Sequence, residues 1–145
     1  MKGNKLSVLV DEQGLPLACR VAPANIHDSR LFEPTVAAFT IPGTTEKPAV
    51  ISADAAYDSQ EIRQYTRKRG IKSNIPINPR NRKYPKRGRP VRFDKNLYKK
   101  RGAVERFFSW IEAFKKLVPR YERYEHSFLG LIYLACALMI WRVLG

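Results

Sequence analysis

Two acidic side chains, Asp54 and Glu105, stand where a carboxylate can do chemistry. Asp54 directly follows residues 49–53, a continuous apolar run typical of a strand inside a sheet. In α/β proteins the carboxyl end of such a strand is where ligands and metals bind. Glu105 lies at the border of an apolar helical arc, one turn after Arg101. A carboxylate placed there needs compensation, which either a divalent metal or Arg101 can supply.

Residues 97–118 are predicted to form the helix that carries Glu105. At about 100° per residue, one face collects only apolar side chains: Val104, Phe107, Phe108, Ile111, Phe114 and Val118. Tyr98, Arg101 and Glu105 follow one another at i, i+3 and i+7 along the edge of that face. The simpler interpretation is a salt-bridged edge of an amphipathic helix.

The elements before this helix predict an α/β fold in a single domain. A hairpin is expected over 6–10 and 15–21, followed by a helix over 30–39 that Asp28 or Ser29 caps. A helix capped by Asp58 and Ser59 should span 60–69, ended by Gly70. Residues 71–77 predict a strand near a sheet edge, because Pro76 cannot donate to a ladder. This order gives a mixed sheet flanked by helices. Asp11 is expected in the hairpin turn, His27 in a loop hydrogen bond, and Asp94 at the start of the 97–118 helix.

The positive charge is concentrated in one part of the chain. The net charge is +14, and 16 of the 27 basic residues lie between Arg63 and Arg101, with Asp94 as the one acid among them. The basic loop 78–96 lacks the apolar residues needed for a core, and its charge density favours a phosphate backbone as partner. The residues expected to contact DNA are Tyr98, Arg101, Arg80, Arg82, Lys83, Lys86, Arg87, Arg89, Arg92, Lys99 and Lys100.

The remaining composition favours a cytoplasmic protein. Cys19 and Cys136 have no pattern of a zinc site and are expected as buried thiols in a reducing compartment. Residues 128–142 are expected to form a buried apolar helix that covers the sheet, because the apolar run is shorter than the roughly 20 residues of a membrane span. No secretory signal is recognised at the N-terminus, and no membrane partner is expected.

With these residues laid out, the chain resembles the catalytic domain of IS4/IS5-type insertion-sequence transposases, a DDE group with a ribonuclease H-like fold. Residues 53–59 (ADAAYDS) resemble the motif around the second catalytic Asp, which makes Asp54 that residue. The spacing of Tyr98, Arg101 and Glu105 resembles the signature helix, which makes Glu105 the third acid. The resemblance implies DNA transposition, with Asp54 and Glu105 as catalytic ligands of Mg²⁺ or Mn²⁺.

Two features depart from that family pattern. The Lys expected seven residues after the Glu is replaced by Glu112. The strand that carries the first catalytic Asp is expected upstream of the 6–10 hairpin strand, so the chain resembles a partial catalytic domain that lacks the first strand. A separate upstream fragment or a frameshifted fusion would supply that strand and Asp, and a homodimer on DNA is a further expectation.

Two other functions remain open at this point. A non-catalytic nucleic-acid-binding module would use residues 78–100 for binding and the Arg101–Glu105 pair only for structure. A membrane-surface protein would use the basic face and the apolar C-terminal run. Metal-dependent stabilisation would distinguish the transposase from a plain DNA binder. Steep salt dependence of DNA binding supports either of these two DNA-binding functions.

Overall fold

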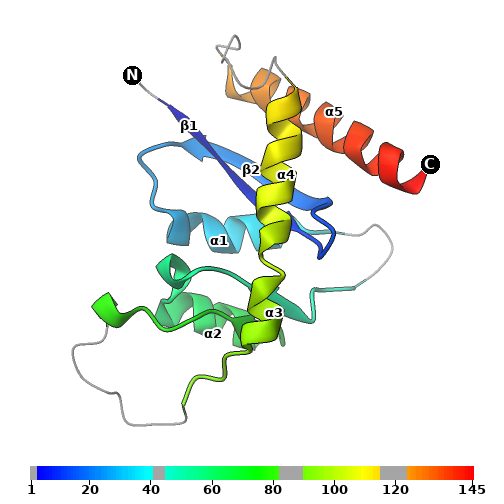
Figure 1. The fold of residues 1–145 in the computed structure, drawn as a ribbon. Helices are drawn as coiled ribbons and strands as arrows, with labels where there is room; N and C mark the ends of the chain where they lie inside the picture. The colour runs from blue at the N-terminus through cyan, green and yellow to red at the C-terminus, as the bar shows by residue number, and fades with distance from the viewer. Residues whose placement is uncertain (1–2, 41–44, 82–89, 115–123) are drawn as a thin grey trace.

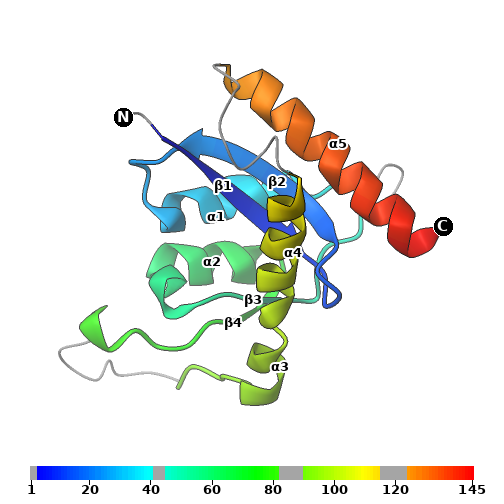
Figure 2. The same cartoon turned by 45° about the horizontal axis from the view of Figure 1, so that its top comes forward.

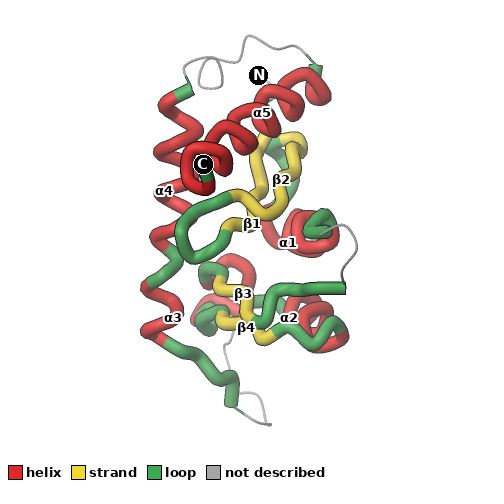
Figure 3. Tube along the Cα trace, turned by 90° about the vertical axis from the view of Figure 1, so that its right-hand side faces the viewer, coloured by secondary structure: helices red, strands yellow, loops and turns green. Residues whose placement is uncertain are grey.

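The computed structural model describes residues 3–40, 45–81, 90–114 and 124–145. Its strands lie in one layer between two layers of helices, with α1 and α2 on one side and α3 and α4 on the other (Figure 1, Figure 3). The elements in chain order are β1 (Asn4–Val10), β2 (Pro16–Pro23), α1 (Asp28–Ala37), β3 (Val50–Ser52), η1 (Ala55–Tyr57), α2 (Gln60–Lys68), β4 (Lys72–Asn74), η2 (Pro79–Asn81), α3 (Lys95–Lys99), α4 (Gly102–Ala113) and α5 (Glu125–Leu144).

The predicted hairpin is present and its turn has the expected chemistry. β1 pairs antiparallel with β2, with Leu6 opposite Val21. The Asp11 carboxylate accepts from the backbone N–H groups of Gln13 and Leu15, both at 2.8 Å, so Asp11 serves the turn. Gly14 has φ +91°, a conformation that L side chains rarely adopt.

The strands form two separate sheets rather than the predicted single mixed sheet. β3 pairs parallel with β4, and within the described ranges neither strand pairs with β1 or β2. The prediction of β3 as a strand with neighbours on both sides is therefore wrong for the described residues. Ile51 is buried, but Val50 is exposed. The predicted edge position of β4 is confirmed by the same pairing.

The predicted 97–118 helix is interrupted, so that α3 and α4 are two helices. At the junction, the N–H of Arg101 donates to the carbonyl of Tyr98 and the N–H of Val104 to the carbonyl of Arg101, each three residues back. This tighter turn includes Gly102, and glycine disfavours the interior of a helix. Asp94 caps α3 as predicted, because its carboxylate accepts from the N–H groups of Asn96 and Leu97. The end of the predicted helix, from 115 on, lies outside the described residues.

The C-terminal helix is longer and more exposed than predicted. α5 covers 20 residues, where 128–142 were expected. One face, with Ile132 and Met139, is buried against the hairpin, whereas Leu134 and Trp141 on the other face are 59% and 72% exposed. The expectation of a fully buried helix is therefore wrong. His126–Leu144 is long and apolar enough by composition to cross a membrane, with mean hydropathy 2.0, a test that core helices also pass.

Two hydrophobic clusters hold the layers together. The first is built around Phe107 of α4 and joins the hairpin to α4 and α5. The second is built around Ile75 and joins α1, β3 and α2. Figure 2 shows α4 and α5 crossing the hairpin, while α2 packs beside β3 and β4. The apolar arc predicted for α4 is confirmed by its fully buried Phe107 and buried Ile111.

Two helix caps differ from the predictions. His27, and not Asp28 or Ser29, is the N-cap of α1, with its Nδ1 accepting from the Ser29 N–H. Ser59 caps α2 as expected, with its hydroxyl accepting from the Ile62 N–H. Asp58 does not cap that helix.

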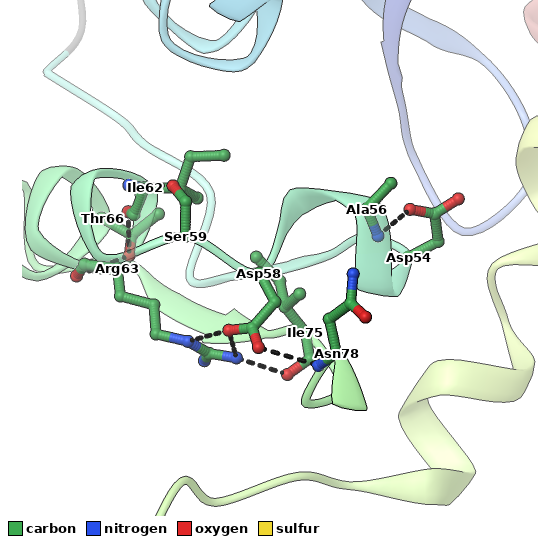
Figure 4. Close-up of polar contacts among 9 residues, drawn as sticks. All are labelled: Asp54, Ala56, Asp58, Ser59, Ile62, Arg63, Thr66, Ile75 and Asn78. Atoms are coloured by element: carbon green, nitrogen blue, oxygen red, sulfur yellow. Dashed lines mark hydrogen bonds and ion pairs between the residues drawn. The ribbon is translucent and has the colours of Figure 1, made fainter. Parts of the chain in front are cut away.

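Asp58 is instead the centre of a buried network (Figure 4). Its carboxylate accepts from Arg63 Nε at 2.8 Å and from the Asn78 N–H at 2.8 Å, and it pairs with Arg63 Nη2 at 2.8 Å. Arg63 also donates to the Ile75 carbonyl. The sequence predicted a cap for Asp58 because this residue stands next to a helix start. Nothing in the sequence indicated the network, because the partner at residue 78 is distant in the chain. The network fixes α2 against the segment that follows β4.

Candidate active site

Asp54 is fixed at the end of β3 by a local turn. Its Oδ1 accepts from the Ala56 N–H at 2.8 Å, which makes Asp54 the N-cap of the short helix η1. The other carboxylate oxygen, Oδ2, points toward Arg101 at 3.7 Å. One oxygen is thus held by the backbone while the second remains available to a cation.

Arg101 and Glu105 are positioned by one contact at the start of α3 and another at the start of α4. At the start of α3, the buried Asn74 side chain accepts from the Asp94 N–H at 2.9 Å and donates to the Asp94 carbonyl at 3.0 Å. On α4, a Cβ at Gly14 would lie 2.8 Å from the Ala103 carbonyl oxygen, so the hairpin turn touches the α4 backbone directly. The sequence analysis missed Asn74, because an amide at a strand end gives no signal of the distant helix that it binds.

The fold brings Asp54 and Glu105 to the walls of one cavity. The two residues are 51 positions apart in the sequence, and both line a cavity of about 230 Å³. Arg101 lies between them, with Nη1 3.7 Å from Asp54 Oδ2 and Nη2 3.9 Å from Glu105 Oε1. The side chain of Glu105 is 77% exposed, against 44% for Asp54 and 38% for Arg101. These contacts are long and exposed to solvent, so Arg101 holds neither carboxylate firmly.

Tyr98 supports Arg101 from the preceding helix. The guanidinium carbon lies 5.4 Å from the centre of the Tyr98 ring, a cation–π distance, and the same ring packs edge-on against Phe93 at 5.1 Å. The i, i+3 spacing predicted this proximity. Tyr98 therefore orients the guanidinium that faces the cavity.

Only some of the predicted DNA-contacting residues can be located. Arg80 lies in η2, and Arg92, Lys99 and Lys100 lie on the approach to α4. Lys100 pairs with Glu12 of the hairpin turn at 2.9 Å, with both side chains more than half exposed. The predicted contacts Arg82, Lys83, Lys86, Arg87 and Arg89 lie outside the described residues.

The donor set fits a hard divalent cation in kind. Asp54 and Glu105 offer carboxylate oxygens, which Mg²⁺ and Mn²⁺ prefer. Within the described ranges, no group of three or more His, Cys, Asp or Glu side chains is gathered for a metal. In the described part of the chain, Asp54 and Glu105 are the two acidic side chains that line this cavity.

Tyr57 borders the same cavity and its ionisation is suppressed. Burial, with smaller contributions from Asp28 and Asp54, raises the pKa of Tyr57 to about 12. Its ring packs against Phe32 of α1 at 5.8 Å. Tyr57 is therefore a neutral hydroxyl at any physiological pH.

Comparison with known proteins identifies the family. The sequence model of the family described as "Transposase DDE domain" matches residues 1–140. The chain belongs to the transposase DDE domain family. This DDE domain is 33% identical over 138 residues to a Brucella ovis protein named "Putative transposase for insertion sequence element IS6501", covering 95% of the chain and 97% of that relative. No solved structure matches it significantly.

A second relative is longer than this DDE domain. The Burkholderia cepacia protein named "Putative transposase for insertion sequence element IS402" is 31% identical over 147 residues. The match covers 98% of this chain but 64% of the relative. The chain thus spans just under two thirds of the IS402 relative.

Proposed function

We propose that this DDE domain takes part in DNA transposition by metal-dependent cleavage and strand transfer at the ends of an insertion sequence. The observation that supports this most strongly is the convergence of Asp54 and Glu105, distant in the sequence, on one cavity with Arg101 between them. We assign the chain to the IS4/IS5-type group and its fold to a ribonuclease H-like sheet. Both assignments rest on the resemblance of residues 53–59 and of the Tyr98–Arg101–Glu105 spacing.

In this proposal Asp54 and Glu105 are the catalytic residues and hold Mg²⁺ or Mn²⁺. A metal held there would supply activation of the attacking oxygen and stabilisation of the leaving oxygen of a phosphodiester. Asp54 presents Oδ2, because Oδ1 is engaged by the Ala56 N–H. Glu105 is exposed and able to turn toward the cavity. Arg101 contacts both carboxylates and reduces their mutual repulsion, and its guanidinium would be able to bind a phosphate oxygen of DNA.

The basic residues position DNA on this site. Arg92, Lys99, Lys100 and Arg101 follow one another along α3 and its approach, and the basic 78–96 loop precedes them. Lysine and arginine at this density neutralise backbone phosphates without reading the base sequence. DNA bound there passes over the cavity that Asp54 and Glu105 line. We expect the protein to act in the prokaryotic cytoplasm, as a homodimer on DNA.

Two carboxylates hold a metal weakly, so we propose that the site is completed by a third one. The first Asp of the family pattern is assigned to a segment upstream of β1, supplied by another fragment or by a frameshifted fusion. The chain alone is then catalytically impaired. The alternative function, a non-catalytic DNA-binding module, is favoured by one observation: Arg101 lies 3.7 Å from Asp54 and 3.9 Å from Glu105, which gives each carboxylate an ion-pair partner within the protein.

A cleavage assay distinguishes these functions. Mn²⁺-dependent nicking and strand transfer on labelled DNA are measured for the chain alone and for a fusion that adds an upstream strand with an Asp, each with Glu105→Gln. Glu112→Gln is the matched control, because Glu112 is exposed on the same helix away from the cavity. Activity in the fusion that is lost in Glu105→Gln and kept in Glu112→Gln supports the proposal. Salt-sensitive DNA binding with no activity in any form supports the binding module.

A further inference from the structure

A buried amide connects the two parts of the chain that carry the proposed catalytic residues. Asn74, at the end of β4, is 5% exposed. Its Oδ1 accepts from the Asp94 N–H at 2.9 Å, and its Nδ2 donates to the Asp94 carbonyl at 3.0 Å and to the Ser52 hydroxyl at 3.2 Å. Asn74 therefore binds β3 on one side and the start of α3 on the other.

The places of the two partners in the fold show what these three bonds connect. Ser52 lies opposite Asn74 in the parallel ladder of β3 and β4, and Asp54 follows Ser52 by two residues. Asp94 is the N-cap of α3. α4 follows α3 after Arg101 and carries Glu105 in its first turn. The three Asn74 bonds thus join the strand that leads to one carboxylate with the helices that lead to the other.

The Asn74 side chain acts at this place as a peptide group would. It accepts from the N–H and donates to the carbonyl of the same residue, as opposite residues of an antiparallel ladder do. The chain leaves β4 after Asn74 and returns to it at Asp94, 20 residues later (Figure 2). The direction in which the chain enters α3 is therefore fixed by an amide side chain.

Apolar packing alone does not require an amide at this position. Burying an amide costs free energy unless its polar atoms are paired, and an apolar side chain fills a similar space without that cost. Hydrophobic contacts have no preferred direction, whereas hydrogen bonds restrict both distance and angle. A fully bonded buried amide can thus specify how β3 and α3 lie relative to each other, which packing does not.

We propose that Asn74 is a positioning residue of the candidate active site, which sets the separation of Asp54 from Arg101 and Glu105. The ion pairs of Arg101 with these carboxylates are 3.7 and 3.9 Å long and exposed to solvent, so they do not fix the spacing themselves. The bonds of Asn74 are shorter and made by a buried side chain. The catalytic meaning of this inference rests on the proposed function, whereas the spacing itself is measured without metal or DNA.

A nitroxide measures that spacing. It is attached through Ala56→Cys, at an exposed position of η1 close to Asp54, while both native cysteines are buried. Paramagnetic broadening by the nitroxide is measured by NMR at the amides of Arg101 and Glu105. We expect Asn74→Leu, which has a similar shape but makes none of the three bonds, to change the broadening at both amides. Broadening within α2 should stay the same.

A milder variant gives a graded effect and serves if Asn74→Leu does not fold. Ser52→Ala removes the bond between Asn74 and β3 and leaves both bonds to Asp94. It should therefore change the broadening at Arg101 and Glu105 in the same direction, and by less than Asn74→Leu.

Two controls separate position from stability. Thr66→Ala removes a buried hydroxyl that donates to carbonyls of its own helix, α2, so it lowers stability without touching α3. Asp94→Ala removes the carboxylate that caps α3 and leaves the N–H and the carbonyl that Asn74 binds. Neither control should change the broadening at Glu105.

Metal binding tests the connection with the proposed function. Without the nitroxide, Mn²⁺ is expected to broaden the amides of Ala56 and Glu105 in the wild-type protein. With Asn74→Leu, the affinity for Mn²⁺ should fall about tenfold or more, as it does when residues that orient metal ligands are replaced. Broadening by Mn²⁺ should then be lost at Glu105 and kept at Ala56.

Two results would overturn the inference. One is unchanged nitroxide broadening at Arg101 and Glu105 in both Asn74→Leu and Ser52→Ala. The other is a change of the same size in Thr66→Ala or Asp94→Ala, because the effect would then follow stability or the helix cap.

The failure of the proposed function has a different signature. A change of nitroxide broadening confined to the Asn74 and Ser52 variants, in a protein that binds no Mn²⁺, would keep this inference and contradict the proposed function. Mn²⁺ bound by both carboxylates with undiminished affinity in Asn74→Leu would do the reverse.

Discussion

Asp58→Asn is expected to destabilise the protein far more than Asp28→Asn, although both carboxylates form ion pairs of similar length. Asp58 lies 2.8 Å from Arg63 Nη2 with its side chain 5% exposed, whereas Asp28 lies 2.7 Å from Lys5 with its side chain 47% exposed. Distance is therefore matched between the two pairs and burial differs.

The magnitude follows from the Asp58 contacts. Its carboxylate accepts from Arg63 Nε and from the Asn78 N–H, and it pairs with Arg63 Nη2. An Asn oxygen in the Oδ1 position keeps both Arg63 donors, but only as bonds to a neutral acceptor, and its NH₂ then faces the Asn78 N–H. Losing the Asn78 bond and the ionic part of the Arg63 pair, at about 1.5 kcal/mol each, predicts a loss of about 3 kcal/mol in the free energy of unfolding. Asp28→Asn should cost about 1 kcal/mol at most, because solvent screens that pair.

Urea denaturation measures both variants, with hydrogen exchange at Thr66 reporting on α2 if the two cores unfold separately. Arg63→Met and the double variant complete a cycle, in which the double variant should lose less than the sum of the single ones. Equal losses for Asp58→Asn and Asp28→Asn, within about 0.5 kcal/mol, would refute the argument that burial decides the strength of these pairs.

Three further predictions concern the fold. Gly14→Ala should cost about 1–3 kcal/mol, because φ is +91° and a Cβ meets the α4 backbone at 2.8 Å, whereas Gly130→Ala on α5 should stabilise by about 0.5–1 kcal/mol; urea denaturation compares them, and equal effects would contradict the close contact. Burial raises the pKa of Tyr57 to about 12, above its value of 10 in the unfolded chain, so the folded state holds the proton longer and stability should fall between pH 10 and 12. Tyr57→Phe should remove that fall, measured by denaturation across this pH range, and an unchanged fall would assign it to other groups. The thiols of Cys19 and Cys136 lie 3.9 Å apart and buried, so Cys136→Ala should be tolerated better than Cys136→Ser, which buries a hydroxyl in the apolar cluster; equal melting temperatures would contradict this.

Most of the turns, caps and buried helix faces could be predicted, because the sequence signals for them come from residues close together in the chain. The hairpin turn around Gly14, the Asp94 and Ser59 caps and the buried arc of α4 all depend on residues within one or two turns of each other. The helix break at Arg101 was missed because the apolar pattern continues across it. The exposed face of α5 was missed for a similar reason, since an apolar composition does not reveal which side chains find a partner.

Long-range contacts were not predictable from the residues. Asn74 binds the start of α3, and Asp58 binds the segment after β4, although both have the composition of ordinary turn or cap residues. For the candidate site, position at a strand end marked Asp54, and helical spacing marked Arg101 and Glu105. The family resemblance related the two parts, and the fold shows that they share a cavity. Their roles remain a proposal.

The most direct test of the account is whether Asp54 and Glu105 bind one metal ion. Mn²⁺ is titrated into the isotope-labelled protein, and paramagnetic broadening is measured by NMR at the amides of Ala56 and Glu105. The account predicts broadening at both amides, lost from both in Asp54→Asn and in Glu105→Gln, and kept in Glu112→Gln. Broadening of one amide that survives substitution of the other carboxylate, or no broadening near the cavity, would contradict a shared metal site.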